Sequence, residues 1–520
     1  MKPGMRRLAS LFAARPALSL GAATLALHLY ANGGYDYFRD ELYFIVCGQH
    51  LAWGYVDQPP LVPLIARAAR MLFGDSLVGL RLVPALAASA LVALGAEAAR
   101  RLGGGRFAQW LAALSILSAP IFLNQGLLLS TDALQPLAWL AAALALIAAI
   151  DSGRPAPWYV LGAIAGMAML DKYMIAFFLA AAAIGLLLTP QRRVLAHPAP
   201  WLAAGLAVLI ALPNLLWQEA HGWPFLELGA AAANGKNTAY SPPAYFLQQI
   251  LIVGPLSAPI WLAGLAGFAF WPRLAAQRWI ALAWLALMAM MLLVHGKPYY
   301  PAGIYPILLA GGAVAIEAAI RIYTARTAMP GHAARIAIVA VTVLGGAIGL
   351  PVVLPILPVE RFIAYQRAIG LKAESGEKLA LGELPQHYAD MFGWRDMAAA
   401  VGRAYQALAP EDRARAVFFA GNYGEAAAID VFGSPWQLPP AISGHNSYFL
   451  WGPDGHDGSV VLLLSKASRD ELLEVFGAAE PVGYLDNAYA MPYETNVTLW
   501  LCRDRKRPYA DDWGKLKHYE

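Results

Sequence analysis

Acidic and aromatic side chains lie close together in the sequence between residues 32 and 76. Asp40 and Glu41 are neighbours in residues 35–44, YDYFRDELYF, and Asp57 precedes Gln58 in residues 55–61, YVDQPPL. Carboxylates accept hydrogen bonds from hydroxyl groups, and an aromatic side chain offers a flat apolar face with a polar tip. This combination suits a carbohydrate substrate.

Two neighbouring carboxylates repel each other unless a proton, a cation or a metal ion lies between them. An aromatic belt at a membrane surface explains Trp53 or Tyr55, but it does not explain the adjacent pair Asp40-Glu41. We therefore expect Asp40 and Glu41 to be catalytic, and we leave open a divalent metal bound by them. No other cofactor is indicated, and Cys47 and Cys502 form no metal-ligand pattern.

Three further ionisable residues lie near the ends of apolar stretches. Asp132 ends the sequence LLLSTD, Lys172 follows Asp171 within an apolar stretch, and Lys297 precedes Tyr300 in HGKPYY. Asp132 could instead cap a helix, and the lysines could extend toward the membrane surface. We expect these residues to lie at the same membrane depth as the segment 32–76, and to join it in one site.

The composition indicates that apolar helices of a membrane protein position these residues. Of the 520 residues, 59% are hydrophobic and 14% are charged, against about 25% charged in a soluble chain. A spanning helix needs about 20 apolar residues. About eleven stretches qualify or come close, near 13–31, 77–99, 107–124, 132–150, 157–171, 174–189, 200–217, 245–270, 278–294, 301–320 and 334–357. The fold class is therefore mainly α, a polytopic membrane protein.

Charge density more than doubles after residue 357. We therefore divide the chain into a transmembrane catalytic domain, residues 1–357 with a first outer loop at 32–76, and a small α/β domain, residues 358–520. Helices are predicted at 394–408 and 470–476, and strands at 417–420, 460–464 and 498–501. Residues 421–425, GNYGE, follow a strand, and a strand-to-helix turn explains them better than a phosphate site.

The basic residues indicate the orientation. With a cytoplasmic N-terminus, fifteen Lys and Arg lie in inner loops and seven in outer loops. Residues 358–520 then lie outside the cytoplasm, and the helix predicted at 61–73 lies flat on the membrane surface. A cleaved signal peptide over residues 1–31 is the competing interpretation, and it would not change the loop bias. The net charge of +4 reflects this topology and indicates no nucleic-acid partner.

Together, the first outer loop, YVDQPPL, STD at 130–132, LDKY at 170–173 and KPYYP at 297–301 resemble glycosyltransferase family 39 over residues 30–320. That family contains protein mannosyltransferases and the aminoarabinose transferase of lipid A, all of the GT-C fold. The resemblance implies a bacterial inner-membrane enzyme with a periplasmic C-terminal domain. It implies a polyprenyl-phosphate-linked sugar as donor and a lipid, glycan or protein of the envelope as acceptor.

The resemblance also implies roles for individual residues. Asp40 matches the catalytic aspartate, Glu41 its neighbour and Asp132 the second acid, and Lys172 and Lys297 match basic positions near the lipid phosphate. The remaining substrate-binding candidates are Asp57, Gln58, Tyr300, Tyr43 and Tyr55. Gln58 stands where aminoarabinose-type members tend to have Lys, so phosphate recognition here can differ.

Two other functions remain open. A transporter or lipid-carrier flippase also needs many spans and intramembrane charge, although no internal repeat is evident here. A sugar-binding membrane protein would leave Asp40-Glu41 unexplained. We favour a transferase that inverts the sugar by single displacement, with Asp40 as general base and Lys172 and Lys297 beside the leaving phosphate, joined by Lys236 or Arg81.

Overall fold

In a computed structural model, which describes residues 15–327, 330–373 and 377–520, the chain divides into two compact units. The membrane unit consists of residues 1–34, 80–215 and 238–358. The second unit consists of residues 35–79, 216–237 and 359–520, and we call it the outer unit because the loop charges predict that it lies outside the cytoplasm. The segment 35–79 therefore groups with the C-terminal residues, whereas the sequence had placed it with the spans.

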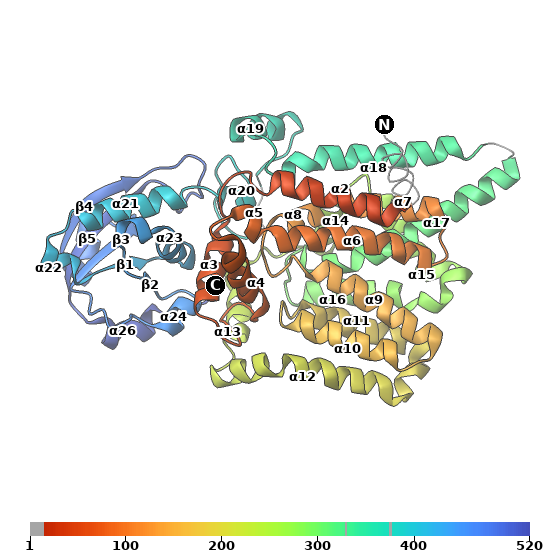
Figure 1. The fold of residues 1–520 in the computed structure, drawn as a ribbon, viewed down its shortest axis with the longest axis horizontal. Helices are drawn as coiled ribbons and strands as arrows, with labels where there is room; N and C mark the ends of the chain where they lie inside the picture. The colour runs from red at the N-terminus through yellow and green to blue at the C-terminus, as the bar shows by residue number, and fades with distance from the viewer. Residues whose placement is uncertain (1–14, 328–329, 374–376) are drawn as a thin grey trace. The chain divides into compact units, whose positions relative to one another are not determined.

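The described part of the membrane unit is built almost entirely from helices, which confirms the mainly α fold class (Figure 1). The helices are α2 (Pro16–Ala31), α6 (Leu82–Arg101), α7 (Arg106–Leu117), α8 (Pro120–Leu127), α9 (Gln135–Ser152), α10 (Ala156–Met169), α11 (Met174–Leu187), α12 (Pro198–Ala220), α14 (Pro242–Val253), α15 (Ala258–Phe270), α16 (Trp279–Leu293), α17 (Tyr305–Thr327) and α18 (His332–Val353). Short η helices follow α11 (η1, Pro190–Ala196), follow α15 (η3, Pro272–Gln277) and precede α17 (η4, Tyr300–Ile304).

Five described helices are long and apolar enough to cross a membrane, or up to eight spans if each of three bent pairs counts as one. Three more apolar helices are shorter: α2, α10 and α16. Each of the eleven stretches predicted from the sequence overlaps at least one of these helices. Eleven spans remain a prediction, since length and composition alone define these candidates.

Two of the predicted stretches are broken rather than continuous. Helices α14 and α15 are bent by 115°, at Gly254-Pro255, and α7 and α8 are bent by 61°, just before Pro120. Proline has no backbone N–H and its ring clashes with the preceding turn, so a helix ends before it. Gly254 has φ +101°, a conformation that a side chain would disfavour.

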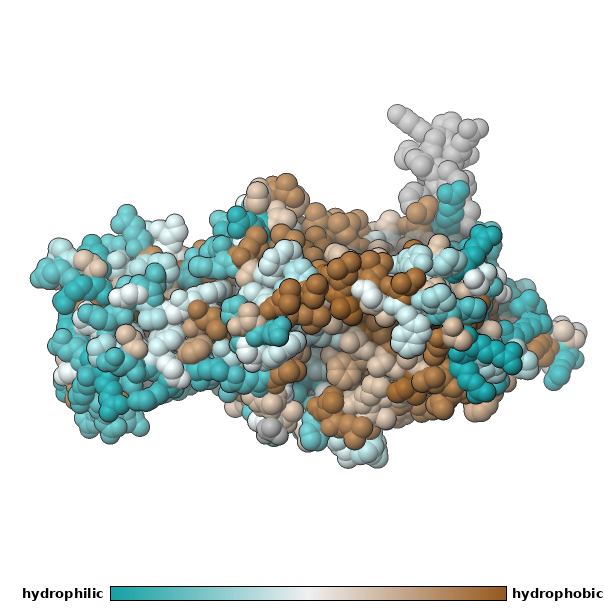
Figure 2. Space-filling view, turned by 90° about the horizontal axis from the view of Figure 1, so that it is seen from below, coloured by the Kyte–Doolittle hydropathy of each residue, from teal (hydrophilic) through white to brown (hydrophobic). Residues whose placement is uncertain are grey.

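Large apolar side chains remain exposed on the helices of the membrane unit. Only 22% of the apolar stretch of α12 and 17% of that of α18 are buried, and Trp201, Leu209 and Ile336 are more than half exposed. Figure 2 shows brown, hydrophobic surface over this unit and mostly teal, hydrophilic surface over the part with the β-strands. Exposed apolar area of this extent is typical of helices that face lipid.

The outer unit combines short helices with one mixed sheet. Its helices include α3 (Arg39–Gln49), α4 (Leu61–Phe73), α5 (Leu77–Leu80), α13 (Pro224–Ala231), η2 (Ala232–Lys236), α19 (Val359–Ala368), α20 (Gln386–Ala389), α21 (Trp394–Gln406), α22 (Pro410–Arg413), α23 (Tyr423–Phe432), η5 (Ser434–Trp436), α24 (Ser447–Trp451), α25 (Arg469–Val475) and α26 (Tyr509–Leu516). The strands are β1 (Ala416–Ala420), β2 (Ile442–Ser443), β3 (Val460–Ser465), β4 (Phe476–Leu485) and β5 (Val497–Arg505).

The sheet has the order β2-β1-β3-β5-β4 (Figure 1). Strand β1 pairs parallel to β2 and β3, whereas β5 pairs antiparallel to β3 and β4. Val461 and Leu463, two residues apart on β3, share one hydrophobic core with Tyr509 of α26. Helix α23 packs on β1, and α21 packs on both α23 and β4.

The predicted strands at 417–420, 460–464 and 498–501 are confirmed as parts of β1, β3 and β5. The predicted helices at 394–408 and 470–476 are confirmed as α21 and α25, within two residues at each end. The sequence did not predict β4, because Gly477, Pro481 and Gly483 interrupt it.

Candidate active site

Asp40 lies in the first turn of α3, and its neighbour Glu41 explains why the helix begins there. The Glu41 carboxylate accepts a hydrogen bond from the backbone N–H of Phe38, at 2.9 Å, as in a capping box. Glu41 is fully buried, whereas the Asp40 side chain is 32% exposed. Only Asp40 of this pair therefore presents an accessible carboxylate.

The Asp40 carboxylate is held by two groups of the outer unit. The hydroxyl of Tyr423, at the start of α23, donates to it at 2.7 Å, and the Arg39 guanidinium lies 3.5 Å away. Arg39 itself donates to the hydroxyl of Tyr493 at 2.6 Å and lies 4.0 Å from Asp390. Burial raises the pKa of Asp390 to about 6, and the positive charge of Arg39 opposes that rise. Asp40 thus belongs to a network that fixes its orientation.

Tyr423 occupies its position because of the turn that precedes α23. The side chain of Asn422 caps the helix by accepting from the backbone N–H groups of Gly424 and Glu425, at 2.8 and 3.1 Å. A Cβ on Gly424 would lie 2.5 Å from the side chain of Arg39, so this position leaves no room for one. GNYGE is therefore a strand-to-helix turn, as the sequence indicated.

A buried pair of glutamates lies behind this turn. Asn422 donates to Glu494 at 2.8 Å and to Glu425 at 3.2 Å. Burial, followed by the repulsion between the two carboxylates, raises the pKa of Glu425 well above its usual range, and burial raises the pKa of Glu494 too. Burial and mutual repulsion thus favour the protonated form in this pair.

Asp57 is also bound to a tyrosine of the outer unit. The hydroxyl of Tyr43 on α3 donates to the Asp57 carboxylate at 2.9 Å and accepts from the backbone N–H of Ser447 at 3.2 Å. The Ser447 hydroxyl in turn accepts from the backbone N–H of Val56 at 3.2 Å. Tyr43 lies beside Tyr423, with 4.8 Å between ring centroids. Asp57 and Asp40 are therefore linked to the same cluster of tyrosines.

Tyr55 and Gln58 are buried within the loop that follows α3. The hydroxyl of Tyr55 donates to the carbonyl oxygens of Cys47 and His50, at 2.8 and 3.1 Å. The side-chain nitrogen of Gln58 lies 3.7 Å from the sulfur of Cys47. These contacts hold the loop against the end of α3.

Three residues predicted from distant parts of the sequence lie together in the membrane unit. The ammonium of Lys172 donates to both carboxylate oxygens of Asp132, at 2.7 and 2.8 Å. The same nitrogen lies 4.8 Å from the ring centroid of Tyr300, within the range of a cation–π contact. Both members of the ion pair are less than one fifth exposed. The pair is therefore partly shielded from water, which strengthens its attraction.

Hydrogen bonds also hold Asp171, the neighbour of Lys172 in the chain. Asp171 is buried and accepts from the Gln135 amide at 2.6 Å, and Gln135 accepts from Trp139 at 3.0 Å.

The other basic residues predicted for the site make separate contacts. The carbonyl of Lys297 accepts from the hydroxyl of Tyr245 at 3.2 Å. Arg81 is buried, and its guanidinium donates to the carbonyl of Asn32 at 3.0 Å, a contact that stabilises the unit. The side chain of Lys236 lies outside the described residues, as do Lys2, Arg6 and Arg7.

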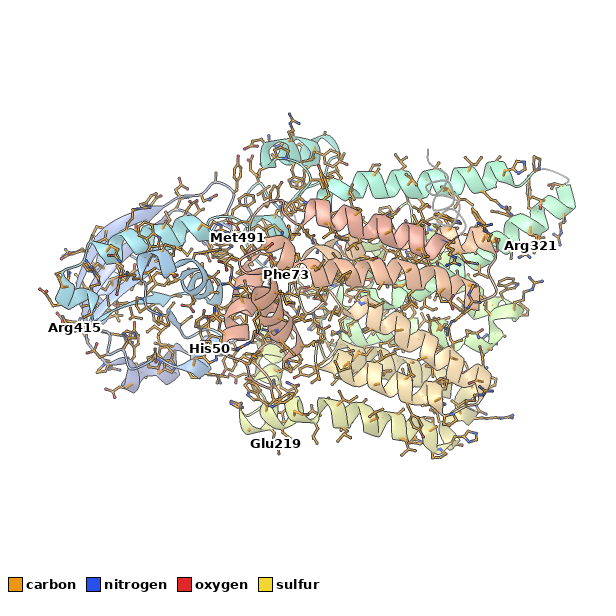
Figure 3. All side chains as sticks on the ribbon, viewed as in Figure 1. His50, Phe73, Glu219, Arg321, Arg415 and Met491 are labelled. Carbon is orange, nitrogen blue, oxygen red and sulfur yellow. The ribbon has the colours of Figure 1, made fainter. Side chains whose placement is uncertain are left out.

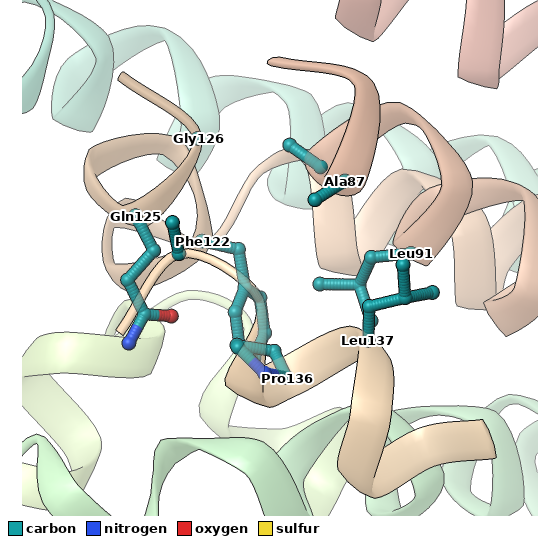
Figure 4. A pocket seen from close by; sticks show the side chains of 9 residues that line it. Ala87, Leu91, Phe122, Gln125, Gly126, Pro136 and Leu137 are labelled. Carbon is teal, nitrogen blue, oxygen red and sulfur yellow. The ribbon is translucent and has the colours of Figure 1, made fainter. Parts of the chain in front are cut away.

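One small pocket opens among α6, α8 and the start of α9 (Figure 4). Its volume is about 10 Å³, and Leu91, Phe122 and Leu137 are among its apolar lining residues. That is room for about one water molecule, which is too small for a sugar or a prenyl chain. Within the described ranges, no three His, Cys, Asp or Glu residues are grouped so that they could hold a metal ion.

Sequence reasoning missed the residues that hold Asp40. From the sequence, Arg39 counts only as one of the seven basic residues of the outer loops, and Tyr423 is only part of the turn GNYGE. The sequence does contain one signal, since GNYGE places an aromatic hydroxyl at the start of a helix. The partner of that hydroxyl is 383 positions away in the chain, and no local pattern identifies it.

Comparison with known proteins supports the resemblance. Residues 57–217 match the family model of dolichyl-phosphate-mannose-protein mannosyltransferases. That stretch includes Asp57, Gln58, Asp132 and Lys172. The lipid A galacturonosyltransferase RgtD of Rhizobium johnstonii is 28% identical over 235 residues, which are 42% of this chain and 47% of RgtD. The chain thus spans about half the length of this curated relative.

Two solved structures show the same fold. ArnT from Cupriavidus metallidurans in the apo state has a TM-score of 0.59 at 14% identity, over 96% of this chain and 98% of ArnT. ArnT bound to undecaprenyl phosphate has the same TM-score at 15% identity, over 93% and 97%. The resemblance to this group of GT-C glycosyltransferases, which the sequence indicated, is confirmed.

Proposed function

From this confirmed resemblance to GT-C glycosyltransferases, we propose that the chain transfers a sugar from a polyprenyl-phosphate-linked donor to a lipid A-type acceptor. The observation that carries the proposal is the Asp40 carboxylate, which is partly exposed and oriented by Tyr423 at 2.7 Å. The ArnT structure bound to undecaprenyl phosphate supports a polyprenyl-phosphate donor, and RgtD, a lipid A galacturonosyltransferase, supports a lipid acceptor. The reaction then takes place at the outer face of a bacterial inner membrane.

In the proposed reaction, a hydroxyl of the acceptor attacks the anomeric carbon of the donor sugar. Asp40 accepts the proton of that hydroxyl while the bond between the anomeric carbon and the phosphate oxygen breaks. The products are the glycosylated acceptor and the polyprenyl phosphate. A single displacement of this kind inverts the anomeric configuration.

The leaving phosphate requires positive charge. We assign this role to Lys172 and Lys297, since a preorganised ammonium in a water-poor site stabilises developing negative charge strongly. Asp132 positions Lys172 through two short contacts, and Tyr300 shields the same ammonium. The exposed apolar faces of α12 and α18 are suited to contact with lipid, including a prenyl chain.

The test is mass spectrometry of envelope lipids from cells with and without the gene, followed by transfer with purified protein. The proposal expects a sugar-bearing lipid that disappears without the gene, and release of polyprenyl phosphate in the purified reaction. Movement of a labelled lipid between leaflets with no new glycosidic bond would instead support the flippase. An unchanged lipid profile together with no transfer would refute the proposal.

A further inference from the structure

Helix α4 of the outer unit has two different faces. Val62, Ala66 and Ala69 are buried, whereas Leu64, Met71 and Leu72 are 50%, 78% and 75% exposed. Because successive residues turn by about 100° around a helix, the three exposed side chains form one stripe. An amphipathic helix with an exposed apolar stripe is typical of a segment that lies in the membrane surface.

Helices α3 and α4 lie side by side and approach closely at Gly48 (Figure 1). A Cβ on Gly48 would lie 2.8 Å from the carbonyl oxygen of Pro63 and 3.1 Å from the backbone nitrogen of Arg67. Figure 3 labels His50, which follows α3, and Phe73, the last residue of α4. Residues of both helices line an open pocket of about 390 Å³. Its lining residues are Ile45, Gly48, Gln49, Arg67, Arg70 and Met71.

Two of these lining residues are arginines that the proposed reaction does not use. Arg67 is exposed and donates one hydrogen bond, at 3.1 Å, to the carbonyl of Gly48. Arg70 lies 2.6 Å from Asp75, whose side chain is 82% exposed. A guanidinium carries five N–H donors in a planar fork that matches the oxygens of a phosphate. The pocket therefore contains two groups suited to a phosphate.

We propose that the pocket between α3 and α4 binds the phosphate of an anionic membrane lipid, whose acyl chains lie along the exposed stripe of α4. The position of Met71 favours a lipid over a free anion as the ligand, because Met71 lines the pocket and also belongs to the exposed stripe. Positive charge beside exposed apolar side chains is complementary to a negatively charged head group with its chains. This site goes beyond the proposed transfer reaction and does not depend on it.

The experiment measures lipid binding to full-length protein in a non-ionic detergent by native mass spectrometry. Phosphatidylglycerol, which is anionic, and phosphatidylcholine with the same acyl chains are titrated separately. We expect wild type to prefer phosphatidylglycerol, and Arg67→Gln/Arg70→Gln to lower that affinity on the order of tenfold. The matched control, Arg361→Gln/Arg507→Gln, removes two exposed arginines of the same unit and should bind like wild type.

A second variant, Met71→Gln/Leu72→Gln, tests the apolar part and should weaken the binding of both lipids. If inorganic phosphate displaces phosphatidylglycerol and this variant binds like wild type, the site takes a free anion and the lipid proposal is refuted. Equal binding by wild type and Arg67→Gln/Arg70→Gln would also refute it. Should that variant not fold, Arg67→Lys/Arg70→Lys keeps both charges but loses the planar fork, and unchanged binding would then refute a guanidinium–phosphate fit.

Discussion

The hydroxyl of Tyr423 donates a 2.7 Å hydrogen bond to the carboxylate of Asp40, across 383 positions of the chain. Tyr423 begins a helix of the C-terminal α/β part, whereas Asp40 belongs to the segment predicted to carry the chemistry. Both lie in one compact unit, and Arg39 stacks on Tyr423 with 5.0 Å between the guanidinium carbon and the ring centroid. A residue of the C-terminal part thus fixes the orientation of the Asp40 carboxylate.

Replacing Tyr423 by Phe should lower kcat by about 10- to 100-fold, because a hydrogen bond to a charged group contributes roughly 1.5–3 kcal/mol. The aromatic ring stays, so the packing against Arg39 and Tyr43 is kept. KM for the donor should change little. The measurement is steady-state transfer by the purified variant.

Tyr448→Phe is the matched control, because its hydroxyl makes the same kind of bond, 2.6 Å long, to Asp430. It should leave kcat within a few-fold of wild type. If both variants lose activity and melting temperature equally, Tyr423 supports the fold and does not position Asp40.

Lys172→Gln should reduce transfer much more than it reduces expression or melting temperature, because it removes the charge assigned to the leaving phosphate. Asp132→Asn should give a smaller loss, since Lys172 keeps its charge but loses its two short contacts. Lys172→Arg tests geometry, because a planar fork does not replace a compact ammonium. Variants that lose stability but keep specific activity would show that the pair is only structural.

The pH dependence of the stability should include a contribution from Asp430, a buried residue of α23. Burial raises the pKa of Asp430 from 3.8 to about 6. The folded protein therefore holds this proton up to about pH 6, whereas the unfolded chain releases it near pH 4. Between these values the contribution of Asp430 to the free energy of unfolding falls as pH rises, and above pH 6 this contribution stays level.

Asp430→Asn removes this dependence. Its melting temperature should come closer to that of wild type as pH rises from 4 to 6. Over this range the difference in the free energy of unfolding between the two proteins should shrink by at most about 3 kcal/mol. Asp511→Asn, at an exposed position, should follow wild type at every pH. A constant difference between wild type and Asp430→Asn from pH 4 to 7 would contradict the raised pKa.

The loop charges predict that residues 358–520 lie outside the cytoplasm and that the loop after α9 lies inside. Ser434 and Ser152 are exposed, and the two native cysteines, Cys47 and Cys502, are buried. In intact cells whose outer membrane is permeabilised, an impermeant thiol reagent should label Ser434→Cys but not Ser152→Cys. Labelling of Ser152→Cys but not of Ser434→Cys would contradict the predicted orientation and indicate the opposite one.

The sequence was sufficient for features that depend on local pattern. The helix predicted at 61–73 is present with these bounds. The three predicted strands begin within two residues of the N-terminal ends of β1, β3 and β5. The sequence also singled out Asp132, Lys172 and Tyr300, which lie together. Ionisable groups at the ends of apolar stretches are costly enough to be conspicuous.

The contacts of the outer unit were not predictable in this way. The sequence predicts that Glu41 is catalytic, and this stays a prediction. It does not predict that the Glu41 carboxylate caps α3, a contact that depends on the extended conformation of Phe38. The grouping of residues 35–79 with 359–520 depends on contacts such as that of Tyr43 with Ser447, 404 positions apart. Such contacts leave no periodic pattern in the sequence.

The most direct test of the account is the turnover of Asp40→Asn, with a polyprenyl-phosphate sugar as donor and the identified lipid as acceptor. Asparagine keeps the size and can still accept from Tyr423, but it cannot accept the proton, so activity should fall on the order of 10²–10⁴-fold with the melting temperature unchanged. Glu41→Gln preserves the cap and should lose less, and Asp36→Asn, in the same segment, should stay near wild type. Near-wild-type turnover of folded Asp40→Asn would contradict the account.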